Sequence, residues 1–273
     1  IGGSRASLAL MTAEEFGIEY ERVEVVIADT QSIGFTDVTG GSRVTFATGM
    51  AVIEAAADVR RQLCERAAAV WEVDAERVVW EDGEARLKGE SDRAPLTLAE
   101  LAQNAGRTGG PISGRAALTA RGVGMAFGAH ICDVEVDPET GRVEVIRYTA
   151  VQDAGRAIHP SYVEGQMQGG AVQGIGWALN EEYVFDSDGK LENPGFLDYR
   201  IPVASDVPMI DTVIVEVPNP KHPYGVRGVG EVPIVAPIPA VVNAVYAATG
   251  VRFRDLPLSP PKVLVGLDGK SAA

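Results

Sequence analysis

The sequence predicts an α+β fold with mixed or antiparallel sheets packed against helices. Two segments, 78–87 and 129–151, have strand-like residue patterns on either side of turn residues. Two longer segments, an alanine-rich one over 49–73 and a glycine-rich one over 161–182, have helical character. Because helices and hairpins follow one another without regular strand–helix alternation, we expect an α+β domain rather than a parallel α/β sheet.

The first part of the chain contains five predicted elements. They are a helix over 4–16 that Gly17 ends, a strand over 23–28, a helix over 49–73, a hairpin over 78–87 through Asp82-Gly83, and a short helix over 96–103. A glycine-rich stretch over 104–114 is the candidate internal boundary of a domain that covers residues 1–273.

The second part contains strands, two helices and a hairpin. The elements are paired strands over 129–136 and 143–151, a helix over 161–182, a hairpin over 184–191, a strand over 212–217, and a helix over 237–248. Ser161 and Glu164 have the spacing of a capping box at the start of the first helix. The uncharged stretch 232–251 is long enough to span a membrane, but its three closely spaced prolines instead predict a buried loop leading into a buried helix.

Composition excludes several classes of function. The net charge of −14 disfavours nucleic acid and anionic membrane surfaces as partners. The two cysteines, Cys64 and Cys132, form no CxxC pair or Cys/His cluster, so neither a zinc nor an iron–sulfur site is predicted. They support no disulfide framework, and no signal peptide is visible, so we expect a reducing, cytoplasmic location. The first residues, Ile1 to Ser4, read like the middle of a turn, and we expect further sequence upstream.

Three glycine-rich segments are candidates for a binding site, and we expect the loops near residues 40, 166 and 230 to converge in space if they share one ligand. The first, Thr39 to Thr45, combines small residues, hydroxyl groups and Arg43, which suits a loop that donates hydrogen bonds to an anionic ligand. A solvated connection between two elements would have the same composition. The second, 165–176, places five glycines in a predicted helix, and each costs roughly 1 kcal/mol relative to alanine. Close packing against either a neighbouring element or a ligand would offset that cost.

The third segment, Tyr224 to Pro233, places Glu231 directly after three glycines and before a long uncharged stretch. A carboxylate at such a border is expected to be partly desolvated, which raises its pKa and makes it a better base near neutral pH. The alternative is a tight turn in which Glu231 caps the following helix or pairs with Arg227.

Four motifs in register resemble one family. Val163 to Leu179, Gly195 to Pro202, Gly228 to Glu231, and Ala28-Asp29-Thr30 followed by Gly40 to Arg43 look like the molybdopterin-binding subunit of xanthine dehydrogenases and aldehyde oxidoreductases. The resemblance covers only the C-terminal half of that subunit, and it implies the second molybdenum-cofactor-binding domain of a molybdenum hydroxylase. One departure is Gly2-Gly3-Ser4, where the family often has Gly-Gln-Gly.

The resemblance also implies a mechanism. Glu231 would be the catalytic base that deprotonates a metal-bound hydroxide; that oxygen attacks an aldehyde or N-heterocycle, and hydride passes to the molybdenum centre. No protein atom would bind the metal. The residues implied to contact the cofactor are Gly40, Gly41, Ser42, Arg43, Thr45, Gln166, Gly228, Val229 and Gly230.

The resemblance implies cofactors and partners as well. The cofactor would be molybdenum–molybdopterin, expected in its cytosine dinucleotide form. Iron–sulfur clusters and FAD would lie on partner subunits, and the N-terminal half of the molybdenum subunit would be a further partner. Two other interpretations remain. The chain could be a non-catalytic fragment or scaffold domain that is inactive without its partner half, or a small-molecule-binding protein unrelated to molybdenum.

Overall fold

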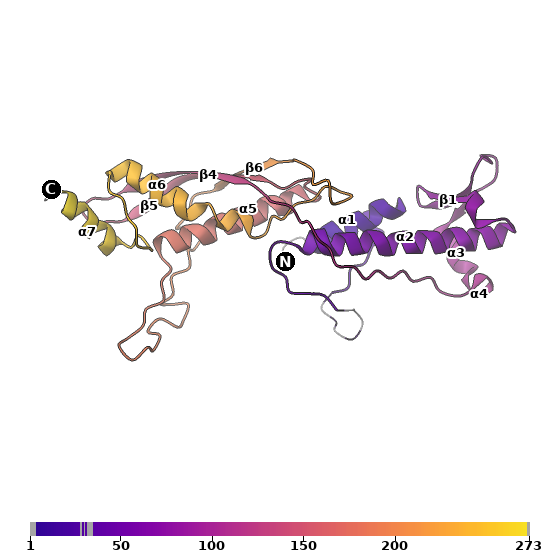
Figure 1. Ribbon diagram of the computed structural model, residues 1–273, viewed down its shortest axis with the longest axis horizontal. Helices are drawn as coiled ribbons and strands as arrows, with labels where there is room; N and C mark the ends of the chain where they lie inside the picture. Colours follow the sequence, from indigo (N-terminus) through magenta and orange to yellow (C-terminus); the bar gives the residue numbers. More distant parts are fainter. Residues whose placement is uncertain (1–3, 28, 30, 32–34, 272–273) are drawn as a thin grey trace. The chain divides into compact units, whose positions relative to one another are not determined.

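The computed structural model describes residues 4–27, 29, 31 and 35–271, and it divides the chain into two compact units (Figure 1). The first unit ends at Val123 and the second begins at Gly124. The predicted boundary over 104–114 therefore lies inside the first unit. The reason is packing, because a Cβ built on Gly114 would overlap the Ala55 carbonyl, and Gln62 Nε2 donates to the Ser113 carbonyl at 3.0 Å.

The first unit consists of two long helices and a small sheet with short helices. Its elements are α1 (Ser4–Phe16), η1 (Tyr20–Arg22), α2 (Val44–Trp71), η2 (Ala75–Arg77), β1 (Val78–Glu81), β2 (Glu84–Leu87), β3 (Leu96–Thr97), α3 (Leu98–Gln103) and α4 (Ala105–Thr108). The sheet has the order β1-β2-β3 with antiparallel pairs. The C-terminal part of α2 packs on it through a core that includes Leu63, Ala67 and Leu101.

Local signals in the first unit predicted most of its elements. The helix over 4–16 and its end at Gly17, where φ is +65°, are confirmed. The hairpin is also confirmed, and Asp82 and Gly83 have the positive φ angles that its two-residue turn requires. The long helix begins five residues earlier than predicted, at Val44.

The predicted strand over 23–28 is wrong for residues 23–27, and Ala28 lies outside the described residues. The segment is apolar and β-branched, but it forms no ladder with another described strand, and the side chains of Val26 and Ile27 are exposed. A strand needs hydrogen bonds from a neighbouring strand, and residue pattern alone does not supply that neighbour.

The second unit packs three helices and a three-stranded sheet. Its elements are β4 (Gly128–Val136), β5 (Val143–Asp153), α5 (Pro160–Leu179), β6 (Ile210–Val215), η3 (Val232–Ile234), α6 (Pro237–Thr249) and α7 (Pro260–Ser271). The sheet order is β4-β5-β6, with β4 antiparallel and β6 parallel to β5. Helices α5 and α6 cover one face of this sheet (Figure 1). Helices and mixed sheets together give the α+β class that the sequence predicted.

Two predictions in the second unit need correction. The capping box at Ser161 is wrong, because Pro160 takes the first helical position of α5 and His159 is the N-cap, without a side-chain cap hydrogen bond. Residues 184–191 form only an isolated bridge between Phe185 and Leu191 rather than a full hairpin. The sequence analysis also missed α7, which a Pro-Pro pair introduces.

The stretch Val232–Thr249 is long and apolar enough to cross a membrane by length and composition, with a mean hydropathy of 1.6. The structure divides this stretch between η3 and α6, so no single continuous helix spans it. The predicted burial is wrong for most of α6, because only a stripe through Pro237, Val241 and Val245 is buried against the sheet and α5.

Candidate functional site

Glu231 lies at the end of the third glycine-rich segment, directly before η3. Its side chain is exposed, so the predicted partial desolvation is wrong for this chain. The capping alternative is wrong too, because Glu231 occupies the N-cap position of η3 without a side-chain cap hydrogen bond. The other alternative, a pair with Arg227, is not what the structure shows, because the Arg227 guanidinium forms its ion pair with Asp153.

Backbone hydrogen bonds hold the start of this segment against the end of β5. Arg227 N donates to the Ala154 carbonyl at 3.1 Å, and Arg156 N donates to the Gly225 carbonyl at 3.0 Å. Gly155 has a φ of +63°, and a Cβ there would collide with the Gly225 carbonyl. Only glycine at position 155 allows the two segments to approach so closely.

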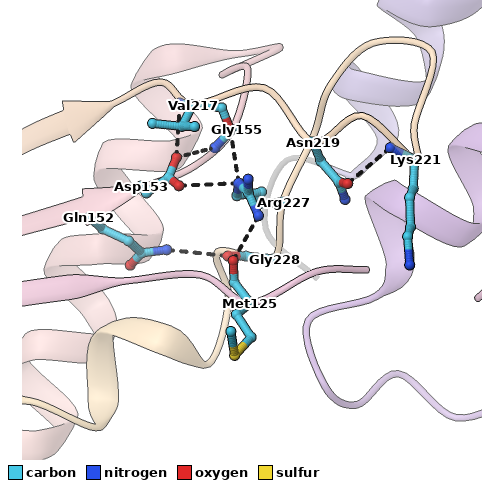
Figure 2. A network of polar contacts seen from close by, with 9 residues as sticks. All are labelled: Met125, Gln152, Asp153, Gly155, Val217, Asn219, Lys221, Arg227 and Gly228. Atoms are coloured by element: carbon cyan, nitrogen blue, oxygen red, sulfur yellow. Dashed lines mark hydrogen bonds and ion pairs between the residues drawn. The ribbon is translucent and has the colours of Figure 1, made fainter. Parts of the chain in front are cut away.

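Side chains tie the same place to two further segments (Figure 2). Arg227 Nε lies 3.1 Å from Asp153 Oδ2 and donates to the Val217 carbonyl at 2.8 Å, while Nη1 donates to the Met125 carbonyl at 2.8 Å. Asp153 Oδ1 accepts from Gly155 N at 2.9 Å and from Val217 N at 3.1 Å. We call Asp153 and Arg227 the clamp pair.

Gln152 adds a third anchor one residue before the clamp pair. Its side chain is 1% exposed, and its Nε2 donates to the Gly228 carbonyl at 3.3 Å (Figure 2). Its Oε1 is buried without a hydrogen-bond partner among the described residues. A buried acceptor without a partner is costly, so this amide oxygen lowers the stability of the fold.

The segment that follows Glu231 is held by α5. A Cβ built on Gly170 would lie 2.7 Å from Pro233 Cγ, and one on Gly174 would lie 2.6 Å from Pro237 Cβ. These two glycines lie one turn apart on the same face of α5, so they form a groove into which η3 and the start of α6 fit. For this face of the helix, the prediction of close packing on a neighbouring element is confirmed.

Another pair of glycines on α5 is open. Gly165 and Gly169 also lie one turn apart, and a Cβ on either would meet nothing within 4 Å. Gln166 lies between these two faces, one turn before Gly170, and is half-buried. Gln166 therefore lies on the side of α5 that packs against η3. The helix η3 begins directly after Glu231.

The segment from Gly40 to Thr45, which includes the first two residues of α2, belongs to the first unit. Gly41 and Ser42 have φ angles of +65° and +55°, and they lead directly into α2. Arg43 pairs with Asp37 at 3.0 Å. A Cβ on Gly40 or Gly41 would meet nothing within 4 Å, so this backbone is accessible beside the N-terminus of a long helix. The predicted convergence of this loop with Gln166 and Glu231 stays a prediction.

Taken one by one, these segments carry open backbone and polar groups that suit contact with an anionic ligand. The open glycines on α5 and before α2 leave room for close approach of a ligand, while Gln166, Ser42 and Thr45 offer amide or hydroxyl groups. Among the described residues no group of three or more His, Cys, Asp or Glu side chains could hold a metal ion. Of the motif residues, Gly2, Gly3, Ala28 and Thr30 lie outside the described part of the chain.

The sequence analysis missed Gln152 and Asp153. A signal was present, because the two polar residues directly follow the apolar pair Ala150-Val151 at the end of the predicted strand over 143–151. Polar side chains at the end of a buried strand often serve a neighbouring loop, but the sequence did not identify that loop.

Comparisons with known proteins show which family the chain is similar to. The sequence profile described as the molybdopterin cofactor-binding domain matches residues 1–208. The xanthine dehydrogenase molybdenum-binding subunit of Escherichia coli O157:H7 is 31% identical over 266 residues, which are 96% of this chain and 35% of that protein. The nicotine 6-hydroxylase large subunit of Paenarthrobacter nicotinovorans is 33% identical over 279 residues, which are 98% of this chain and 34% of that protein.

Solved structures give the same result. CO dehydrogenase from Oligotropha carboxidovorans matches 99% of this chain and 34% of its own with a TM-score of 0.85 and 27% identity. Quinoline 2-oxidoreductase from Pseudomonas putida 86 matches 97% of this chain and 35% of its own with a TM-score of 0.83 and 30% identity. The chain thus spans about a third of the length of these relatives, a smaller share than the half that the sequence resemblance suggested.

Proposed function

Because this chain belongs to the molybdopterin cofactor-binding domain family, we propose that it forms part of the active site of a molybdenum-dependent oxidoreductase in which Glu231 is the catalytic base. The observation that carries the proposal is the placement of Glu231 between two independent anchors. The clamp pair and Gln152 hold the chain before it, and the glycine groove of α5 holds the chain after it. A carboxylate fixed on both sides is prepared for proton transfer in a defined place.

The residues proposed to contact the cofactor lie in the three glycine-rich segments. In the first unit these residues are Gly40, Gly41, Ser42, Arg43 and Thr45, and in the second they are Gln166, Gly228, Val229 and Gly230. When bound, the molybdenum cofactor supplies two-electron oxidation chemistry. We propose its cytosine dinucleotide form, with backbone N–H groups before α2 facing its anionic groups.

Glu231 would supply the proton chemistry. One oxygen of its carboxylate accepts the proton that the water-derived nucleophile loses as this nucleophile attacks the substrate. The substrate would be an aldehyde or an N-heterocycle. Relatives named for xanthine, nicotine and quinoline support the second class, because all three compounds contain ring nitrogens that make a neighbouring carbon electron-poor.

The partner would be the remaining polypeptide of the molybdenum subunit, because this chain spans only about a third of its relatives. Exposed apolar side chains support a docking role, since large exposed apolar areas mark contact surfaces. Phe196 and Leu197 are 90% and 96% exposed, and Ile131 and Val213 are exposed on the sheet face opposite α5. Covering the site would exclude bulk water from the surroundings of Glu231. Iron–sulfur and FAD subunits would complete a cytoplasmic complex.

Substitution of Glu231 in the intact enzyme tests the assignment. Glu231→Gln keeps the size of the side chain but removes the base, so kcat should fall by roughly two to four powers of ten. Molybdenum content, measured by elemental analysis, should match wild type. The control is Glu164→Gln, which neutralises another exposed carboxylate in the same unit and should leave kcat unchanged. Full activity of the Glu231 variant at wild-type molybdenum content would refute the role, and loss of the cofactor would make Glu231 structural.

The isolated 273-residue chain tests the need for a partner. Because the proposed site is open to solvent in this chain, we expect it to purify without molybdenum and without activity. Elemental analysis after expression in a host that makes the cofactor decides this. Stoichiometric molybdenum in the isolated chain would contradict a site that needs further polypeptide. A chain that binds no cofactor even within the complex would favour the scaffold interpretation.

A further inference from the structure

We propose that Asp153 and Arg227, the clamp pair, are positioning residues that set where the Glu231 carboxylate lies. The proposal rests on the proposed role of Glu231 as the base. Neither residue is placed against the substrate or the cofactor. They would act through the backbone that carries Glu231.

The clamp pair ties four separate segments together at one point. These are the segment before β4, the end of β5, the segment after β6 and the glycine-rich segment that leads to Glu231 (Figure 2). The two side chains are 14% and 10% exposed, so solvent screens their interaction far less than it would a surface pair. Hydrogen bonds that involve a charged group are stronger than neutral ones, and here each charged side chain bonds backbone groups as well as its partner.

The distance along the chain from the clamp pair to the base is short. Only Gly228, Val229 and Gly230 separate Arg227 from Glu231, and two of these three are glycines. Glycine has the widest range of backbone conformations, so without an anchor this connection would allow the carboxylate to move. The clamp pair fixes Arg227, directly before the connection, and the bond from Gln152 to Gly228 fixes the first residue of the connection.

Small displacements of a base matter for rate. A misplacement of about 1 Å by a change away from the chemistry can cost on the order of a hundredfold in rate. A clamp that holds the carrier backbone therefore contributes to kcat even though it never touches the substrate. The competing explanation is that the clamp pair only stabilises the fold, closing the end of the sheet at β5 and β6.

Asp153→Asn in the intact, cofactor-loaded enzyme separates the two explanations. Asparagine keeps the acceptor for Gly155 N and Val217 N but loses the charge that holds the guanidinium. We expect kcat to fall by about tenfold to a hundredfold, with KM and molybdenum content near wild type. Arg227→Lys should give a smaller loss of kcat, because lysine keeps the positive charge. Some loss is still expected, because lysine lacks the guanidinium group that donates to two backbone carbonyls.

The control for a loss of stability alone is Val263→Ala. This substitution creates a cavity at a fully buried position of α7, outside the site. It should lower Tm, but kcat should stay within about twofold of wild type, because distant sites act independently. If Asp153→Asn loses no more kcat than Val263→Ala at an equal loss of Tm, the clamp pair is structural and the proposal is wrong.

Two further measurements do not depend on the rate of a single variant. Hydrogen exchange of the backbone amides from Val226 to Glu231 should become faster in Asp153→Asn, while exchange in α5 stays unchanged. The double variant Asp153→Asn/Glu231→Gln should be no slower than Glu231→Gln alone, because the clamp pair acts only through Glu231. Unchanged exchange over 226–231, or an additive loss in the double variant, would overturn the positioning role.

These outcomes also separate this inference from the proposed function. Full activity of Glu231→Gln would refute the base, whatever the clamp variants do. A large loss in Glu231→Gln, together with a wild-type rate in Asp153→Asn, would leave the base intact and refute only the positioning role.

Discussion

Two glycine-rich segments of this chain have similar composition and opposite behaviour. The segments Gly40–Thr45 and Gly225–Glu231 each contain one arginine that pairs with an aspartate, at 3.0 and 3.1 Å. The exposed fractions of the first pair are 31% and 63%, whereas those of the second are 14% and 10%. The first backbone has free space beside its glycines, and the second is in contact on several sides.

This difference teaches that glycine content does not decide whether a segment is open or fixed. Arg227 is fixed because carbonyls and a carboxylate from distant segments surround it, while Arg43 pairs with an exposed residue nearby in the chain. The two segments suit two tasks. An open backbone before a long helix suits a ligand with hydrogen-bond acceptors, and a fixed one suits a carboxylate that must act in one place.

The largest expected difference in stability is between alanine variants of two glycines that have similar φ angles, Gly155 and Gly41. Gly155→Ala should destabilise the chain by about 4 kcal/mol, because the new Cβ overlaps the Gly225 carbonyl and lies 2.8 Å from Arg227 N. Gly41→Ala should cost only about 1 kcal/mol, the cost of the left-handed conformation itself. Urea unfolding of both variants measures the two values. Equal losses would mean that conformation, and not contact, distinguishes the segments.

The next largest expected difference in stability is between variants of the two arginines, Arg227 and Arg43. Arg227→Gln leaves a mostly buried carboxylate without its charged partner, so a loss of about 3 kcal/mol is expected. Arg43→Gln removes an exposed pair and should cost less than about 1 kcal/mol. Added salt should reduce only the second value, because exposed charges are screened. Urea unfolding at low and high salt measures both, and a comparable loss at both sites would contradict the contrast.

The smallest effect tests the same contrast within one helix. Gly170→Ala should lower stability by about 1 kcal/mol net, because overlap with the Pro233 ring exceeds the gain in helix propensity. Gly169→Ala, its neighbour, should raise stability by up to about 1 kcal/mol, since nothing lies within 4 Å. Thermal unfolding compares them. If both variants were stabilised, the groove would not be tightly packed. Loss of molybdenum from the Gly169 variant of the intact enzyme would place the open face against the cofactor.

Elements with strong local signals were predicted well. The turn residues Asp82 and Gly83 predicted the first hairpin, and Gly17 predicted the end of the first helix. Each of these depends on a backbone conformation that the residue itself favours. The predicted strand was wrong over residues 23–27, because a strand needs a neighbouring strand. The capping box at Ser161 was wrong, because Pro160 takes the first position of the helix.

The sequence by itself determined the α+β class, most of the elements and the motifs that identify the family, because these follow from residue order over short distances. It also placed Glu231 at the end of a glycine-rich turn. Only the tertiary structure decided which glycines are closed and which are open, and that Asp153 rather than Glu231 pairs with Arg227. Burial and ion pairing depend on which distant segments meet, and that meeting is a property of the packed chain.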